Sequence, residues 1–169
     1  MSGGSHRPQS CRSAERLAII IPYRNRFEHL HILLNTLIPL LVRQLADFRI
    51  FVIDQDMPTT FNRGMLFNVG FLEAEKIDNF DCFIFHDVDM LPLNDHCFYR
   101  CSSNPKHLTA AVSKWKYSLP YEGYFGGVVA FTKSQFKHIN GDSNLYFGWG
   151  GEDDDLKGRV KKMGYTRLR

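Results

Sequence analysis

The chain has 169 residues, which is enough for one domain with a sizeable hydrophobic core. Its hydrophobic content of 44% and charged content of 23% are typical of a soluble protein, and a scattered net charge of +3 does not indicate a nucleic-acid-binding protein. No apolar run approaches the roughly 20 residues of a membrane span, and no signal peptide is recognisable. We therefore expect a polar N-terminal arm at residues 1–16 and a single domain at residues 17–169.

The first half of the chain alternates between strand and helix patterns. Residues 17–22 form an isoleucine-rich apolar run typical of a buried parallel strand, and residues 49–55 and 82–89 are similar. Leucines at helical spacing predict a helix from residue 27 that Pro39 should kink or end, and a second helix follows over residues 61–76. This β-α-β-α-β order predicts a parallel sheet with right-handed crossovers.

The second half is less regular. Residues 107–113 and 126–131 are consistent with short strands, and residues 133–139 with a short helix. Leu156, Val160 and Met163 fall at positions i, i+4 and i+7, which predicts a helix that ends at Gly164. We find no internal repeat or linker, so a single domain is expected.

Charged residues follow the first and third predicted strands, in "PYRNR" and "HDVD". In an open parallel sheet, ligands bind at the carboxyl ends of the strands. Asp87 and Asp89 would point to the same side of an extended segment, which suits a divalent cation with a phosphate ligand. A solvated pair of loop acids is the alternative. Arginines at positions 24, 26 and 63 could together grip a diphosphate, although each alone could be a surface residue.

The stretch "YFGWGGEDDD" at residues 146–155 places aromatic rings and glycines before four consecutive acids. Acids at a helix N-terminus complement the helix dipole, so a capped helix is the simplest interpretation. The glycines on both sides of Trp149, however, would let the backbone approach a ligand closely. An indole face beside carboxylates suits a sugar, and one carboxylate could act as general base toward a hydroxyl nucleophile.

Four cysteines occur, at positions 11, 82, 97 and 101, and they form no zinc-type C-x-x-C pair. Cys82 and Cys101 flank a predicted strand and loop. The spacing leaves a local disulfide and two buried free thiols equally open.

Five motifs in series closely resemble the β-1,4-galactosyltransferase family: "IIIPYRNR", "FNRGMLFNVGF", "FHDVDMLPLNDH", "YFGGVVAF" and "FGWGGEDDD". The resemblance runs from about Arg7 to the last residue. It implies an α/β GT-A-type nucleotide-sugar-binding fold, with a mostly parallel central sheet flanked by helices. It also implies a type II membrane protein of the Golgi, with its catalytic domain in the lumen and its membrane segment absent from this chain. The implied reaction is inverting, Mn²⁺-dependent transfer of galactose from UDP-galactose to the 4-hydroxyl of a terminal N-acetylglucosamine.

The resemblance also assigns roles to residues of this chain. It implies that Asp153 is the catalytic base, that Asp89 is a metal ligand, and that Cys82 and Cys101 form a disulfide. The donor-binding residues that it implies are Pro22, Tyr23, Arg24, Arg26, Phe61, Arg63, Asp87, Val88, Lys114, Tyr124, Trp149 and Glu152. The acceptor-binding residues that it implies are Trp115, Tyr121, Tyr146, Phe147, Gly150, Gly151, Asp153 and Asp154.

Three alternatives stay open beside this interpretation. Relatives that transfer N-acetylgalactosamine carry a smaller aliphatic residue at the position of Tyr124, so this tyrosine favours galactose. Xylose-directed relatives resemble "WGREDDE" rather than the "WGGEDDD" of this chain. The third alternative is a truncated, non-catalytic sugar-binding relative. Family members place further metal ligands after the last predicted helix, so we expect residues 1–169 alone to be weakly active or inactive.

Overall fold

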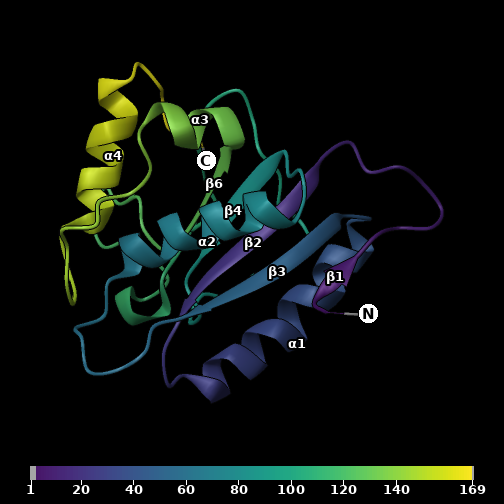
Figure 1. Ribbon diagram of the computed structural model, residues 1–169, viewed down its shortest axis with the longest axis horizontal. Helices are drawn as coiled ribbons and strands as arrows, with labels where there is room; N and C mark the ends of the chain where they lie inside the picture. Colours follow the sequence, from purple (N-terminus) through teal and green to yellow (C-terminus); the bar gives the residue numbers. More distant parts are fainter. Residues whose placement is uncertain (1–2, 169) are drawn as a thin grey trace.

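Strand β2 (Arg16–Tyr23) forms the centre of the fold, because its residues alternate between two hydrophobic clusters on opposite faces of one sheet. The computed structural model describes residues 3–168 (Figure 1). Its strands pair in the order β1-β3-β2-β4-β6-β5. The other strands are β1 (Ser5–His6), β3 (Asp47–Asp54), β4 (Cys82–His86), β5 (Lys106–His107) and β6 (Val128–Thr132).

The three central strands are parallel, and the outer strands are antiparallel. Both β3 and β4 pair in parallel with β2, and they are reached through helices α1 (Phe27–Arg43) and α2 (Arg63–Ile77). This confirms the predicted β-α-β-α-β unit and the α/β class. Strands β1, β6 and β5 pair antiparallel with their neighbours, so the whole sheet is mixed. Strand β1 lies within the arm for which no element was predicted.

Helices cover both faces of the sheet. Leu17, Ile19 and Ile21 pack with buried leucines of α1, whereas Ala18 and Ile20 pack with α2 and with α4 (Glu152–Lys162) on the other face. The short helix α3 (Lys133–His138) joins this second cluster. Full burial of one such aliphatic side chain is worth about 1.5–3 kcal/mol, which explains why β2 is apolar on both faces.

Helix α1 continues through Pro39 to Arg43, so the prediction that the proline could end the helix is wrong. Leu37, Leu40 and Leu41 are buried on both sides of the proline, and their packing against the sheet holds the helix together. Within residues 3–168, neither α1 nor any other helix combines the length and apolar character needed to cross a membrane.

Two predicted strands are shorter than expected. Strand β4 ends at His86 instead of residue 89, because the chain turns there and Met90 N–H donates to the carbonyl of Asp87. Strand β5 is only two residues long. After it, the Thr109 hydroxyl accepts the N–H of Val128, so a side chain takes the place of the backbone acceptor that a longer ladder would use. A short 3-10 helix, η1 (Ser113–Trp115), follows.

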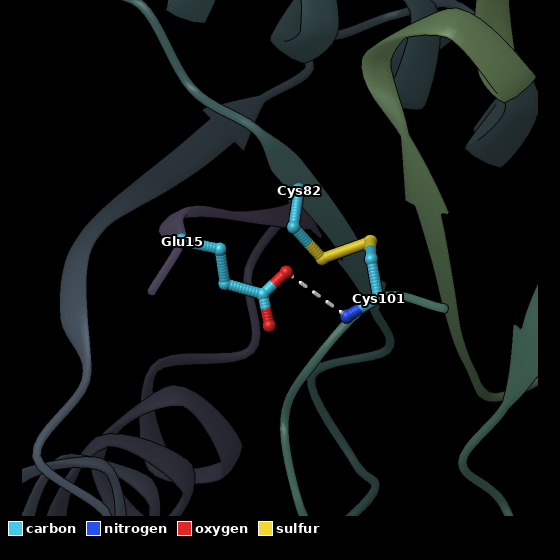
Figure 2. Close-up of side chains that lie close together, drawn as sticks. All are labelled: Glu15, Cys82 and Cys101. Carbon is cyan, nitrogen blue, oxygen red and sulfur yellow. Dashed lines mark hydrogen bonds between the residues drawn. A yellow bond between two sulfur atoms is a disulfide. The ribbon is translucent and has the colours of Figure 1, made fainter. Parts of the chain in front are cut away.

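The disulfide implied by the resemblance is present and joins Cys82, at the start of β4, to Cys101 (Figure 2). Glu15 lies beside it, and its carboxylate accepts the N–H of Cys101 at 3.3 Å. The bridge therefore ties the central sheet to the segment that precedes β5. Cys11 and Cys97 are free thiols, the first exposed and the second half-buried.

Candidate active site

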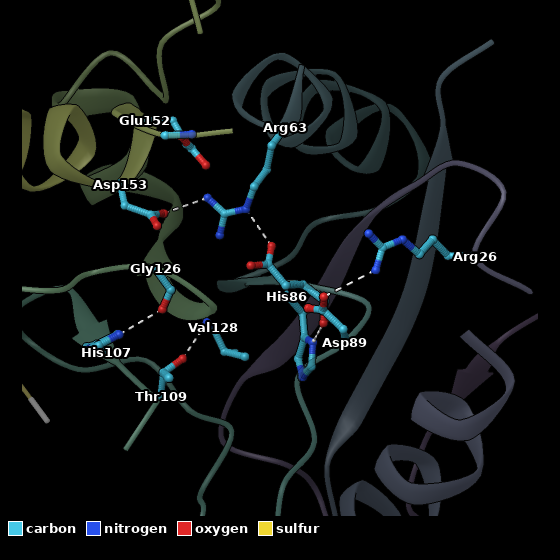
Figure 3. Close-up of polar contacts among 12 residues, drawn as sticks. Arg26, Arg63, His86, Asp89, His107, Thr109, Gly126, Val128, Glu152 and Asp153 are labelled. Atoms are coloured by element: carbon cyan, nitrogen blue, oxygen red, sulfur yellow. Dashed lines mark hydrogen bonds and ion pairs between the residues drawn. The ribbon is translucent and has the colours of Figure 1, made fainter. Parts of the chain in front are cut away.

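Arg63, the first residue of α2, lies at the centre of the site, between the end of β4 and the start of α4 (Figure 3). Its side chain is only 10% exposed. It donates through Nε to Asp87 Oδ1 at 2.5 Å and through Nη1 to Asp153 Oδ1 at 2.9 Å. Burial alone would lower the pKa of Arg63, but the charges of Asp87 and Asp153 raise it above its ordinary value. One permanent cation therefore joins two carboxylates that are 66 positions apart in the sequence.

Asn62 explains why α2 begins at this point. It is fully buried, and its side-chain oxygen accepts the N–H of Met65, as an N-cap residue does. Its amide nitrogen donates to the carbonyl of Asn144 at 2.7 Å, and its backbone N–H donates to Gln55 Oε1 at 2.8 Å. Asn62 thus holds the end of β3, the start of α2 and the loop before α4 together. The sequence analysis missed this residue, although an asparagine before an apolar helix is a recognisable cap signal.

The acids at the start of α4 do not cap the helix. The N-cap position is Gly151, in a left-handed conformation (φ 92°) with no side-chain cap bond. All four acids do lie in the first turn of α4, so the expectation that they complement the helix dipole is confirmed. The four acids instead have four separate partners: Gly150 N–H for Glu152, Arg63 for Asp153, the Tyr121 hydroxyl for Asp154, and Arg159 for Asp155. Asp153 and Asp154, which are both predicted to bind the acceptor, therefore bond two different side chains, Arg63 and Tyr121.

Asp87 and Asp89 do not point to the same side, contrary to the prediction. That prediction assumed an extended segment, whereas the chain turns immediately after His86. Asp87 points toward Arg63, while the half-exposed Asp89 carboxylate lies 3.5 Å from Nη1 of Arg26. Burial, together with the charges of nearby acids, raises the pKa of Asp87 to about 6.

His86 braces this turn from inside the core. Its Nδ1 lies 2.8 Å from the carbonyl oxygen of Asp87, which can only accept, so Nδ1 carries the proton. Nε2 then accepts from the hydroxyl of Tyr99 at 2.9 Å. Burial lowers the pKa of His86 to about 4, so the ring is neutral at physiological pH and serves as a fixed support.

The two arginines after β2 have different environments, because the left-handed Asn25 (φ 51°) interrupts the predicted alternation. Arg24 donates to the carbonyl of Thr59 at 2.6 Å, and its guanidinium lies 5.3 Å from the centre of the Phe61 ring. Arg26 is half exposed and faces Asp89. Both positive charges therefore lie at the carboxyl edge of the sheet, as predicted.

Gly126 brings Tyr124 close to Asp153. A β-carbon at position 126 would overlap Oδ2 of Asp153 and would lie 2.7 Å from the Tyr124 hydroxyl oxygen, so only glycine fits. The carbonyl of Gly126 accepts from Nε2 of His107 at 2.9 Å, which fixes this segment against β5. Burial, and secondarily the charge of Asp153, raises the pKa of Tyr124. The support from His107 was not predicted.

The remaining predicted residues lie around this centre. Pro22 and Val88 are buried, and Tyr23 is partly buried at the end of β2. Within residues 3–168, no hydrogen bond or ion pair joins the exposed side chains of this set to Arg63 or its two carboxylates. These side chains are Lys114, Trp115, Phe147 and Trp149, and the last is 93% exposed. The loop that carries Trp149 is anchored where Gly148 N–H donates to the carbonyl of Phe61, and the ring of Tyr146 packs against Gly151.

Asp89 is the residue of this site best suited to a metal ion, since it offers exposed carboxylate oxygens of the kind that Mn²⁺ binds. Among residues 3–168, the one close group of three His, Cys, Asp or Glu side chains is Glu15 with Cys82 and Cys101, and there the sulfurs are already joined. Asp89 therefore fits one position in an oxygen-ligand shell. Phosphate oxygens, water or other ligands would have to supply the rest.

Comparison with known proteins agrees with the motifs. Residues 1–102 match a family model described as the N-terminal region of glycosyl transferase group 7, and residues 106–169 match the N-terminal domain of galactosyltransferase. The chain belongs to the glycosyl transferase group 7 family.

Several characterised relatives match almost the whole chain. A β-N-acetyl-D-glucosaminide β-1,4-N-acetylglucosaminyl-transferase from Lymnaea stagnalis is 60% identical, over 99% of this chain and 34% of its own length. Human β-1,4-galactosyltransferase 4 is 53% identical, over 95% of this chain and 47% of its own length. The chain thus spans a third to a half of the curated relatives it matches.

Among solved structures, the catalytic domain of Drosophila β-1,4-galactosyltransferase 7 in complex with xylobiose superposes with a TM-score of 0.84 at 36% identity. The match covers 92% of this chain and 65% of that one. A mutant of the Drosophila enzyme in complex with manganese, UDP-Gal and xylobiose gives a TM-score of 0.83. These structures confirm the GT-A-type fold.

Proposed function

We propose that this chain carries the donor side and the catalytic base of a β-1,4-galactosyltransferase. In this proposal the protein transfers galactose from UDP-galactose to the 4-hydroxyl of a terminal N-acetylglucosamine, with inversion. The observation that carries the proposal is the double ion pair of Arg63, which links the turn after β4 to the first turn of α4. Relatives named as galactosyltransferases and the Drosophila complex with UDP-Gal support it.

The residues of the chain suggest how the transfer would proceed. Arg63 holds Oδ1 of Asp153, which leaves Oδ2 beside Gly126 to accept the proton of the acceptor hydroxyl. The hydroxyl oxygen forms a bond to C1 of galactose as the bond from C1 to the phosphate oxygen breaks, and the electron pair leaves with UDP. Attack from the face opposite UDP converts an α-linked donor into a β-linked product.

Charge on the leaving group needs compensation on the donor side. Arg24 and Arg26 lie at the carboxyl edge of the sheet, where they would bind the diphosphate, and Phe61 would contact the uracil. Mn²⁺, when bound, would stabilise the charge of the departing UDP as a Lewis acid, and Asp89 is the residue that would hold it.

A second candidate is transfer of N-acetylglucosamine, which is the activity in the name of the Lymnaea relative. The two candidates differ in the donor sugar's N-acetyl group. Tyr124 lies beside Asp153 at Gly126, where its phenol would crowd that group. We therefore favour galactose.

A donor panel separates the candidates. We expect the purified full-length protein, with Mn²⁺ and N-acetylglucosamine, to use UDP-galactose and to form a β-1,4 linkage by NMR. Use of UDP-N-acetylglucosamine instead would favour the second candidate, and transfer to xylose alone would contradict the proposed acceptor. No transfer from any donor would contradict the enzyme proposal as a whole.

Replacing Tyr124 tests the steric argument directly. Tyr124→Leu removes the phenol and should admit UDP-N-acetylgalactosamine as a donor. Tyr121→Leu is a matched control, because Tyr121 is also aromatic and lies in the same segment but bonds Asp154. Unchanged donor preference in Tyr124→Leu would refute the role of the phenol.

The Golgi lumen is part of the same proposal. The disulfide between Cys82 and Cys101 supports it, because such bridges persist in oxidising compartments. Co-staining of the tagged full-length protein with a Golgi marker tests it, and a cytosolic signal would contradict it.

A further inference from the structure

The ion pair between Arg26 and Asp89 places a cation against the carboxylate best suited to a metal ion. Nη1 of Arg26 lies 3.5 Å from Oδ2 of Asp89, and each side chain is 51% exposed (Figure 3). Among residues 3–168, no other side chain bonds the carboxylate of Asp89. An ion pair this long and this exposed is weak, so the guanidinium can leave the carboxylate at little cost in free energy.

Backbone hydrogen bonds hold both residues in place without using their side chains. Arg26 is the N-cap residue of α1, where its carbonyl accepts the N–H of Leu30 at 2.9 Å and its side chain makes no cap bond. Asp89 lies in the turn after β4, which the bond from Met90 N–H to the carbonyl of Asp87 closes. The two side chains can therefore change partners while the backbone stays fixed.

Arg24 lacks this freedom, although it is only two positions away. Its guanidinium donates to the carbonyl of Thr59 at 2.6 Å and lies 5.3 Å from the centre of the Phe61 ring. Both of these partners are neutral. Of the two arginines, Arg26 is thus the one whose charge is opposed directly to the carboxylate of Asp89.

A divalent cation on Asp89 would compete with Arg26 for the same carboxylate. Two positive charges on one carboxylate repel each other, and at such short range the repulsion is felt even in water. A diphosphate removes this conflict, because its oxygens can bind the metal ion and accept hydrogen bonds from a guanidinium at the same time.

We propose that Arg26 competes with the metal ion for Asp89 and gives up this carboxylate when the donor diphosphate binds, so that metal and donor bind cooperatively. The inference rests on the proposed function, in which Asp89 holds Mn²⁺ and Arg26 binds the diphosphate. Mn²⁺ alone is then held weakly, and UDP strengthens its binding. By linkage, Mn²⁺ strengthens the binding of UDP by the same factor.

The variant Arg26→Met tests this competition in the full-length protein, because methionine keeps much of the side chain and removes the charge. Electron paramagnetic resonance of free Mn²⁺ measures the affinity for the ion with and without saturating UDP. We expect Mn²⁺ alone to bind roughly three- to tenfold more tightly to the variant. The factor by which UDP improves Mn²⁺ binding should fall to a similar extent.

The direction of the change separates this role from a structural one. Local damage at Arg26 would weaken Mn²⁺ binding, whereas relief of competition strengthens it. Arg26→Lys keeps the charge and should bind Mn²⁺ within about twofold of the wild type. Arg24→Met is the matched control, since it removes a nearby arginine that does not contact Asp89, and it should also stay within about twofold. Asp89→Asn should abolish the binding, which verifies that the ion is on this carboxylate.

Unchanged or weaker binding of Mn²⁺ alone by Arg26→Met would overturn the inference. Tighter binding with an undiminished effect of UDP would also overturn it, as would a wild type that binds no Mn²⁺. The proposed function fails separately. If Mn²⁺ and UDP bind cooperatively and this depends on Arg26, but no sugar is transferred, the inference stands and the transferase proposal does not.

Discussion

Two arginine–carboxylate clusters lie at opposite ends of the same sheet, and they differ in how their acids titrate. At the amino end of β2, Arg16 bonds Asp47 and Asp78, and its backbone N–H donates to Asp81. Hydrogen bonds from Asn79 N–H and then from Arg16 lower the pKa of the exposed Asp78. The ionised form of Asp78 therefore stabilises the fold.

At the carboxyl edge, the cluster around Arg63 has the opposite character. There burial raises the pKa of Asp87 and of Asp142, a buried residue of the loop before α4, and more acids than cations meet in little water. The comparison shows that ion pairs alone do not mark an active site. Unbalanced charge away from water is the more specific sign, because it disfavours folding; the cluster around Arg63 shows it, in agreement with the proposed site.

The largest expected effect comes from removing the central cation. Arg63→Met leaves Asp87 and Asp153 without their partner, which should cost about 3–5 kcal/mol of unfolding free energy at pH 7 and abolish transfer. Arg63 lowers the pKa of Asp87, which burial raises to about 6, so loss of the cation raises this pKa further and the variant should regain stability as the pH falls from 7 to 5. Urea unfolding at several pH values measures this.

Arg63→Lys serves as the control, because it keeps the charge but not the fork of two donors. It should recover part of the stability. If Arg63→Met lost less than about 1 kcal/mol of unfolding free energy, the ion pairs of Arg63 would be as weak as those at an exposed surface.

Removal of Asp153, the proposed base, should affect catalysis and spare the fold. In Asp153→Asn we expect kcat/KM for galactose transfer to fall on the order of 10²–10⁴-fold. The Tm should stay within a few degrees, since one of the crowded acids is gone. Calorimetry with UDP and Mn²⁺ verifies that the donor side is intact. Turnover within tenfold of the wild type would assign the base to another group.

The smallest effect is expected at the other end of the sheet. Arg16→Met should cost roughly 1 kcal/mol and leave transfer unchanged, because Arg16 is remote from Asp153 and partly solvated. Since the pKa of Asp78 is lowered in the folded state, its stabilising contribution is present at neutral pH and lost in acid. Chemical unfolding of wild type and variant should therefore converge at low pH. A large loss of transfer activity in Arg16→Met would contradict the view that only the Arg63 cluster takes part in transfer.

The sequence predicted the elements whose hydrophobic pattern is long enough to be unambiguous. The apolar runs of β2 and β4 predict strands, and the regularly spaced leucines of α1 predict a helix. Strand β1 could not be found this way, because two residues show no periodicity and this strand exists only because the edge of β3 is available. Pro39 was misjudged because tertiary packing outweighs its local preference.

In the candidate site, residue types were predictable but pairings were not. The acids at 152–155 and the arginine in "FNR" indicated a charged centre, yet the partner of each acid depends on contacts between distant segments. Asn62 bonds Asn144 across 82 positions and Asn68 bonds Asp142 across 74. No local pattern predicts these pairings, although the position of Asn62 before α2 does indicate a cap. The predicted orientation of Asp87 and Asp89 was wrong, because the amino-acid composition does not show that the strand ends at His86.

The three bonds of Asn62 have a mechanical consequence. One amide group connects the tryptophan-bearing loop to the helix turn that presents Arg63. Displacement of that loop would therefore strain the hydrogen bonds of Asn62 at the start of α2, the helix that carries Arg63. Through Asn62, a movement of the loop is expected to disturb the ion pair between Arg63 and Asp153.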